Sequence, residues 1–387
     1  MQVEPSVVSM GFELTAAQQA LQDESASLAE TEIEPVAADL DAAGEHPTEI
    51  LQTLGDAGFG GLTVSTEYGG RGADLVGLTV VTEELAAALM PVASALALHL
   101  GVAEAVERFG SDDLRADVLP ELARFETVGA LGLSEANAGS DKLGMETTAE
   151  RDGDEWVLDG HKRWVTNFRH ADVVLTYART GPDADAPHNV SAFLVPTGAF
   201  EVEHVWDTLG ARCVKSPKVT LSSVRVPDAD RVGAVGEAYV QRGQLHTGVN
   251  VPARAVGIAR AAIEDSVAHV ADREQFGHAI GDFQGVRWRV AEMATSVDAA
   301  RSLTRHAAAA ADRGDDPARE SAAAKIFATE TAVDVTNQAL QLHGGIGYTT
   351  ERDVERYLRD ARLLTIAGGP NEGHRDALAD AVFERYG

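Results

Sequence analysis

The segment RDARLLTIAGGPNE, residues 359–372, decides how the fold of this chain is understood. It begins with Arg-Asp-Ala-Arg, continues through a short, mostly apolar run, and closes with two glycines, a proline, an asparagine and a glutamate. The first of those glycines, Gly368, has no side chain and therefore no group that can accept a proton.

On the N-terminal side, residues 1–128 have helical spacing of apolar residues. A long amphipathic helix is expected over 16–40, with a kink or break at Pro35. A buried helix rich in Ala and Leu is expected over 79–98, and Pro91 should divide it in two. Residues 1–128 are therefore expected to form an N-terminal α-helical domain.

The spacing changes at about residue 129 and changes back at about residue 237. Between them lie short β-branched or aromatic runs separated by Gly, Pro and Asp turns: 155–158, 173–177, 192–195 and 219–226. These runs predict a middle domain over 129–236, built as an antiparallel, barrel-like sheet. Helical periodicity then returns over 237–387, interrupted at 313–317, and predicts a C-terminal helical bundle. The fold class is thus α+β, in three domains.

The composition restricts the function. The chain has 387 residues and a formal net charge of −29, and only five of its 32 basic residues are Lys. An acidic, Lys-poor surface suits concentrated salt, where long-range repulsion is screened, so we expect a halophilic, cytoplasmic protein; an acidic mesophilic enzyme is the alternative. No basic stripe favours nucleic acid. The single Cys213 excludes an intrachain disulfide. We expect no membrane span and no signal peptide.

Residues 359–372 resemble the C-terminal signature of the acyl-CoA dehydrogenase family, R-D-x-[RK] followed by an apolar run and Y-E-G-T-x-E-I. The resemblance extends over almost the whole chain, from Phe12 to about Arg375. It implies that FAD lies between the middle domain and the C-terminal bundle, and that four subunits assemble. In the family, the Glu of Y-E-G-T removes the α-proton of an acyl-CoA thioester. Gly368 occupies that position here.

Two motifs in the middle domain carry the flavin resemblance. Residues 133–141 are similar to T-E-P-x-A-G-S-D, which implies that Leu133 and Ser134 contact the flavin and that Ser140 lines the acyl-CoA entrance. Donors at such a turn can stabilise the charge that arrives with a hydride. Residues 162–167 resemble K-x-W-I-T-N, which implies flavin contacts by Trp164 and Thr166. A capped turn and a buried Trp are the alternative interpretations of each motif alone.

Two further segments resemble the family's binding motifs for the FAD pyrophosphate and adenosine. The first resembles R-x-x-F-G followed by F-Q, and the second resembles Q-x-x-G-G-x-G. Arg can bind phosphate through two N–H groups, and glycines let backbone N–H groups approach an anion. In the family these segments act across a subunit interface, which implies an oligomer. The implied cofactor-binding residues are Arg273, Phe276, Gln284, Gln341, Gly344 and Gly345.

The chemistry of the family needs a base, a hydride acceptor at flavin N5 and two donors for the thioester carbonyl. Gly368 retains the backbone N–H that serves as one donor and loses the base, a change that typically costs about 10²–10⁴ in rate. A branch of the family carries its base at the position of Thr247, which is no base either. His246 and Glu372 are the candidate substitutes, although Glu372 matches an ordinary structural Glu of the signature.

Three hypotheses follow for the function. The first is an acyl-CoA dehydrogenase of fatty acid metabolism that performs α,β-dehydrogenation and passes electrons to an electron-transfer flavoprotein. The second is base-independent chemistry, such as desulfination or β-elimination of an anionic acyl-CoA, with Arg71 as the anion-binding residue; a solvated loop charge is the alternative for Arg71. The third is a catalytically silent subunit of a hetero-oligomer rather than a homotetramer. We expect no metal site.

Overall fold

The computed structural model describes residues 13–245 and 247–386. Helix α1 (Ala16–Leu28) begins with a capping box, in which Thr15 and Gln18 each satisfy the other's backbone N–H. A π-helical turn (Ala29–Ile33) then leads into α2 (Glu34–Ala43), and Pro35 lies in the first turn of α2. The helix predicted over 16–40 thus changes to a π-helical turn just before Pro35, at a position where the missing N–H of a proline has no helical partner.

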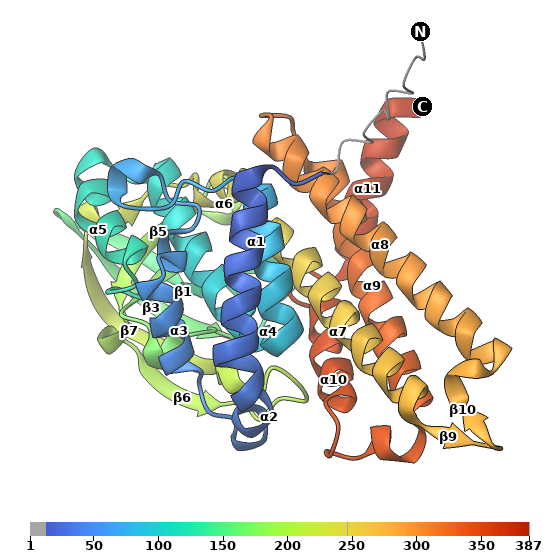
Figure 1. The fold of residues 1–387 in the computed structure, drawn as a ribbon. Coiled ribbons are helices and arrows are strands. Elements are labelled where there is room, and N and C mark those ends of the chain that lie inside the picture. Colours follow the sequence, from blue (N-terminus) through green and yellow to red (C-terminus); the bar gives the residue numbers. More distant parts are fainter. Residues whose placement is uncertain (1–12, 246, 387) are drawn as a thin grey trace, which may run out of the picture.

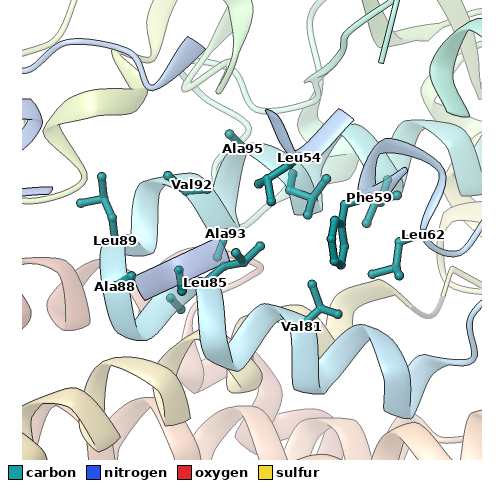
Figure 2. Close-up of a cluster of buried hydrophobic side chains, with 14 of the residues drawn as sticks. Leu54, Phe59, Leu62, Val81, Leu85, Ala88, Leu89, Val92, Ala93 and Ala95 are labelled. Carbon is teal, nitrogen blue, oxygen red and sulfur yellow. The ribbon is translucent and has the colours of Figure 1, made fainter. Parts of the chain in front are cut away.

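Helix α4 (Leu75–Phe109) is the central element of the fold, between α3 (Thr48–Asp56) and α5 (Asp112–Ala123). Leu89 has non-helical angles of φ −154° and ψ 102°, so the division predicted around Pro91 is confirmed. Figure 2 shows side chains of α4, including Leu85, gathered with Phe59 in the buried cluster. One window of α4 is apolar and long enough to cross a membrane, but 83% of that window is buried within this fold.

The middle of the chain forms a sheet in the order β6-β7-β3-β2-β4-β5-β8, with β1 paired to β4. The strands are β1 (Gly129–Gly132), β2 (Thr148–Asp152), β3 (Glu155–Arg163), β4 (Val173–Arg179), β5 (Val190–Pro196), β6 (Glu201–Val205), β7 (Pro217–Pro227) and β8 (Arg231–Val232). Most neighbours are antiparallel, as predicted, but β1 and β2 each pair with β4 in parallel. The hairpin β2–β3 lies between β1 and β4 in the sequence, so β4 returns in the direction of β1. The predicted middle β-domain is confirmed, and these two parallel pairings are where its sheet departs from the antiparallel arrangement.

The long helices of the C-terminal part form the bundle shown in yellow to red in Figure 1. They are α7 (Asn250–Asp272), α8 (Gln284–Asp312), α9 (Ala318–His343), α10 (Val354–Leu364) and α11 (Asn371–Tyr386), whereas the short helix α6 (Ala238–Arg242) packs with the sheet through Ala238. A two-stranded turn, β9 (Glu274–Gln275) and β10 (His278–Ala279), separates α7 from α8. The interruption predicted at 313–317 is the connection between α8 and α9.

The hydrophobic core joins these layers through α4. The N-terminal half of α4 packs with the first helices and with alanines of α8 and α9, including Ala307 and Ala324. Met90, at the bend, packs with the core of α7, α9 and α10. Its C-terminal part, including Val102, packs with Leu175 of the sheet. Helix α4 therefore holds the sheet and the bundle in a fixed relation, and the candidate site lies where α4 and α7 meet the α10–α11 loop.

Candidate active site

The loop between α10 and α11, residues 365–370, has a left-handed backbone at both glycines. Gly368 has φ +71° and Gly369 has φ +98°, a region that residues with a Cβ rarely adopt. A Cβ added at position 368 would lie 3.0 Å from Cγ2 of Val251 on α7. Glycine at position 368 therefore suits both the backbone conformation and the close approach to α7, in addition to lacking a carboxylate.

Lys325 of α9 holds this loop through three hydrogen bonds. Its buried Nζ donates to the carbonyl oxygen of Gly369 at 2.7 Å, to that of Thr365 at 3.3 Å and to Oδ1 of Asn371 at 2.6 Å. Burial lowers the pKa of Lys325 to about 8, and Glu372 acts in the opposite direction. Three neutral acceptors use all three N–H bonds of the ammonium group, so Lys325 positions the loop and has no free lone pair with which to act as a base.

His374, in the first turns of α11, holds the Gly368 carbonyl group. Its Nε2 lies 3.1 Å from the carbonyl oxygen of Gly368. A carbonyl oxygen can only accept, so Nε2 carries the hydrogen and donates it. Burial lowers the pKa of His374, and Lys325 adds to the decrease. His374 is therefore a neutral donor that fixes the orientation of the peptide next to Gly368.

Arg254 lies on α7, one helical turn after Val251. The residue is only 4% exposed. Its Nε donates to the carbonyl oxygen of Asn250 at 3.4 Å, and its Nη1 donates to Oγ of Ser94 on α4. Burial lowers the pKa of Arg254 to about 10. Sequence reasoning missed this residue, because a single Arg in an Ala-rich helix carries no motif.

The catalytic candidates from the sequence lie in different places. Gly368 is in the α10–α11 loop, whereas Glu372 is exposed in the first turn of α11. His246 lies outside the described residues, and Thr247 begins a short 3-10 turn before α7. Arg71 forms a two-pronged ion pair with Glu24, at 2.6 and 3.2 Å. Its charge is already neutralised, and this arrangement does not favour Arg71 as an anion-binding residue.

The first two flavin motifs come together at the edge of the middle domain. The backbone N–H of Arg163 donates to the carbonyl oxygen of Ser134 at 2.8 Å, which joins residues 133–141 to residues 162–167. Trp164 has φ +60°, is 51% exposed and stacks on Trp206 with ring centroids 5.0 Å apart. Thr166 contacts Ser216 through their hydroxyl groups at 3.3 Å. The exposed ring of Trp164 beside this turn is suited to a planar aromatic cofactor.

A buried ion pair holds this arrangement. Nζ of Lys162 lies 2.5 Å from Oε1 of Glu135, and both side chains are fully buried. Glu135 also accepts the backbone N–H of Glu146 at 2.6 Å and that of Thr147 at 3.2 Å. Lys162 stands in the segment that resembles K-x-W-I-T-N, but nothing in the sequence paired it with Glu135.

Leu133 is buried next to this turn, whereas Ser140 is exposed on it. The hydroxyl oxygen of Ser134 accepts a hydrogen bond from Nζ of Lys142 at 2.9 Å. A simple capped turn does not account for the buried ion pair of Lys162 and Glu135 that holds this loop.

The remaining motif residues lie at the far end of the bundle. Arg273 follows α7 and lines a cleft of about 1010 Å³ together with His343 and Gly345. No atom lies within 4 Å of a Cβ added at Gly344 or Gly345, so this backbone is open to a ligand. Phe276 is 90% exposed.

Gln284 begins α8, and Gln341 lies in the last turn of α9. Neither residue lines the cleft. The structure therefore brings Arg273 and the glycine pair together, whereas Phe276 and Gln284 lie on the neighbouring exposed surface. Within residues 13–245 and 247–386, no group of three His, Cys, Asp or Glu side chains is placed to hold a metal ion.

Comparison with known proteins gives three matches to one family. Residues 15–126 match the acyl-CoA dehydrogenase N-terminal domain, residues 130–224 the middle domain and residues 236–383 the C-terminal domain. The chain belongs to the acyl-CoA dehydrogenase family. It is an FAD-dependent, acyl-CoA dehydrogenase-like oxidoreductase, and the fold inferred from residues 359–372 is confirmed.

Individual relatives agree. A probable acyl-CoA dehydrogenase of Bacillus subtilis, YngJ, is 37% identical over 97% of this chain and 100% of its own length. A glutaryl-CoA dehydrogenase solved with glutaryl-CoA is 32% identical, with a TM-score of 0.93 and 97% of each chain covered. PigA, solved with FAD, is 26% identical, with a TM-score of 0.92 and coverage of 97% of this chain and 100% of its own.

Proposed function

We propose that this acyl-CoA dehydrogenase-like protein binds an acyl-CoA thioester against the α10–α11 loop and has no carboxylate there to remove the α-proton. The observation that carries the proposal is the construction of this loop around Gly368. Lys325 and His374 hold its carbonyl groups, at 2.7 and 3.1 Å, while position 368 presents only backbone. A rigid backbone donor suits a thioester carbonyl, because a donor that is already oriented has little freedom to lose on binding.

In the family this position supplies both a backbone donor and a base, and in this chain Gly368 supplies the donor alone. The backbone N–H of Gly368 remains available to polarise the thioester carbonyl. The side chain that would take the proton is absent, and Thr247 supplies none. Bound FAD would supply an acceptor for the β-hydride. We expect α,β-dehydrogenation of a neutral saturated acyl-CoA to be slower by about 10²–10⁴ than in the same protein with a carboxylate at position 368.

FAD binding is proposed at two surfaces. The exposed ring of Trp164, next to Ser134, is suited to the flavin ring. The cleft beside Arg273 and Gly345 offers a guanidinium group and open backbone for the pyrophosphate. Ser140, exposed on the flavin turn, would lie at the acyl-CoA entrance.

The finer expectations remain part of the proposal. The exposed aromatic residues around α8 and the α9–α10 connection, such as Phe276, Trp288 and Tyr348, support assembly into a homotetramer. We propose a cytoplasmic, salt-adapted enzyme of fatty acid metabolism that passes electrons to an electron-transfer flavoprotein. Domain boundaries near residues 128 and 236 belong to the same proposal.

Binding can be tested separately from turnover. The protein is loaded with FAD, and the change in the flavin absorption band is followed while butyryl-CoA is added without oxygen, with free CoA as the matched control. We expect a saturable shift with the thioester that free CoA does not produce. Loss of FAD on gel filtration would contradict the cofactor assignment. Retained FAD with no response to any acyl-CoA would contradict the substrate assignment.

A further inference from the structure

Two basic side chains beneath the site lack a carboxylate partner. Four basic residues are buried in the described part of the chain: Lys162, Arg254, Lys325 and Arg356. Lys162 and Arg356 form ion pairs with Glu135 and Asp353, at 2.5 and 3.2 Å. Arg254 and Lys325 form no ion pair with any residue in 13–245 or 247–386. The two buried basic residues without a carboxylate partner thus both lie near the α10–α11 loop.

Of these two, Arg254 is the more isolated. Glu372 and Glu330 act on Lys325 from a distance, whereas burial is the one influence resolved on Arg254. Removing an unpaired charge from water costs several kcal/mol, even after the surroundings relax. The chain has 61 acidic residues against 32 basic ones, and still the partners of Arg254 among residues 13–245 and 247–386 are neutral oxygen atoms. A buried guanidinium with neutral partners retains its capacity to bind an anion.

The position of Arg254 indicates which anion could reach it. Residues three apart lie on the same face of a helix, and their side chains lean toward its N-terminus. Arg254 therefore leans back toward Val251, the residue that a side chain at position 368 would touch. The hydrogen bond from Arg254 to the carbonyl oxygen of Asn250 has the same direction. The guanidinium thus lies between α7 and α4, one helical turn from the residue of α7 that a side chain at position 368 would touch.

We propose that Arg254 and Ser94 form an anion-binding end of the acyl pocket, and that the acyl-CoA bound by this chain carries a carboxylate on its acyl group. The inference rests on the proposed acyl-CoA function and specifies its substrate class. A ligand carboxylate would accept from the guanidinium in place of the neutral contacts and complete a buried, charge-assisted pair. The protein without ligand would carry the unpaired charge until substrate arrives.

The test compares two thioesters of equal chain length, succinyl-CoA and butyryl-CoA, by isothermal titration calorimetry on the FAD-loaded protein. We expect wild type to bind succinyl-CoA at least about tenfold more tightly, the usual scale for a charge-assisted contact. Arg254→Met should remove this preference, so that the dissociation constants of the two thioesters become equal to within about twofold. Ser94→Ala should reduce the preference, and Arg71→Met, the matched Arg variant, should leave it intact.

The outcomes separate the inference from the function on which it rests. Equal or tighter binding of butyryl-CoA by wild type overturns the anion-binding inference and leaves the acyl-CoA function in place. Absence of binding by either thioester overturns both. Loss of the preference in Arg71→Met with retention in Arg254→Met would assign the anion to Arg71 and overturn the inference. Thermal unfolding without ligand gives an independent check, because Arg254→Met should match or exceed wild type, whereas a purely structural Arg254 would make that variant less stable.

Discussion

Lys325 on α9 donates to the carbonyl oxygen of Gly369, 44 positions further along the chain, at 2.7 Å. Through this contact a buried ammonium group fixes the backbone of the loop that carries Gly368. Replacing Lys325 by Met removes three hydrogen bonds and leaves the carbonyl group of Gly369 without a donor, whereas the carbonyl group of Thr365 still accepts from the N–H of Asn371 at 3.1 Å. We expect Lys325→Met to lower the free energy of unfolding by about 2 kcal/mol, measured by urea denaturation.

The matched control is Lys218→Met, which removes a lysine that is paired with Glu203 at the protein surface. Exposed ion pairs contribute little, so the change should stay below about 1 kcal/mol. Equal effects of the two substitutions would contradict the anchoring role of Lys325.

Gly368 can be tested through its backbone. With φ +71° and Val251 Cγ2 at 3.0 Å from an added Cβ, Gly368→Ala is strained in two ways. We expect it to destabilise the protein by about 1–3 kcal/mol. Adding Val251→Ala to Gly368→Ala should recover the part of the lost stability that comes from the contact with Val251. The part that comes from the positive φ should remain. The control is Gly153→Ala, where φ is +68° but no atom lies within 4 Å, so that it reports the backbone cost alone.

The buried pair Lys162–Glu135 should be essential to the flavin turn. Removing one partner leaves the other charged and unpaired, which typically costs about 3–5 kcal/mol. We expect Glu135→Gln and Lys162→Met each to unfold at a clearly lower temperature and to lose FAD on gel filtration. The double variant should be less affected than the two single effects added together. Full additivity in this double-mutant cycle would show that the two side chains are not coupled.

Asp360 gives a pH dependence with a defined sign. Burial raises the pKa of Asp360 from 3.8 to about 6, although the N–H of Ala211 donates to it at 2.6 Å. The folded protein then binds more protons than the unfolded chain between about pH 4 and pH 6, so this group's contribution to stability is lost as pH rises through that window. The difference corresponds to roughly 3 kcal/mol.

Asp360→Asn should remove this loss, so the variant should gain on wild type as pH rises from 4 to 6 and run parallel above it. Urea denaturation at several pH values measures the difference, and the exposed Asp56→Asn is the control. A stability difference between Asp360→Asn and wild type that stays constant across this window would contradict the assignment.

The sequence predicted the helices and strands whose formation depends on residues adjacent in the chain. Pro91 divides α4 and Pro35 lies in the first turn of α2, because each proline acts on its own helical turn. The β-branched runs predicted strands for the same local reason. The parallel pairing of β1 with β4 was missed, because strand direction depends on how a hairpin is inserted between them.

The site was predicted only where a motif carried it. Arg254 reaches Ser94 across 160 positions, and Lys162 reaches Glu135 between two motifs that had been considered separately. Contacts between distant segments leave no trace in local periodicity. The ion pair of Arg71 with Glu24 could not be predicted for the same reason, because the two residues lie 47 positions apart.

The most direct test of the central claim is the rate at which a neutral saturated acyl-CoA bleaches the flavin band. FAD-loaded wild type and the double variant Gly368→Glu, Val251→Ala are mixed with butyryl-CoA without oxygen in a stopped-flow instrument, with Val251→Ala alone as the control. The account predicts binding by all three proteins and bleaching at least about 100-fold faster in the double variant, because only that protein has a carboxylate at position 368. Wild type that bleaches as fast as the double variant would contradict it.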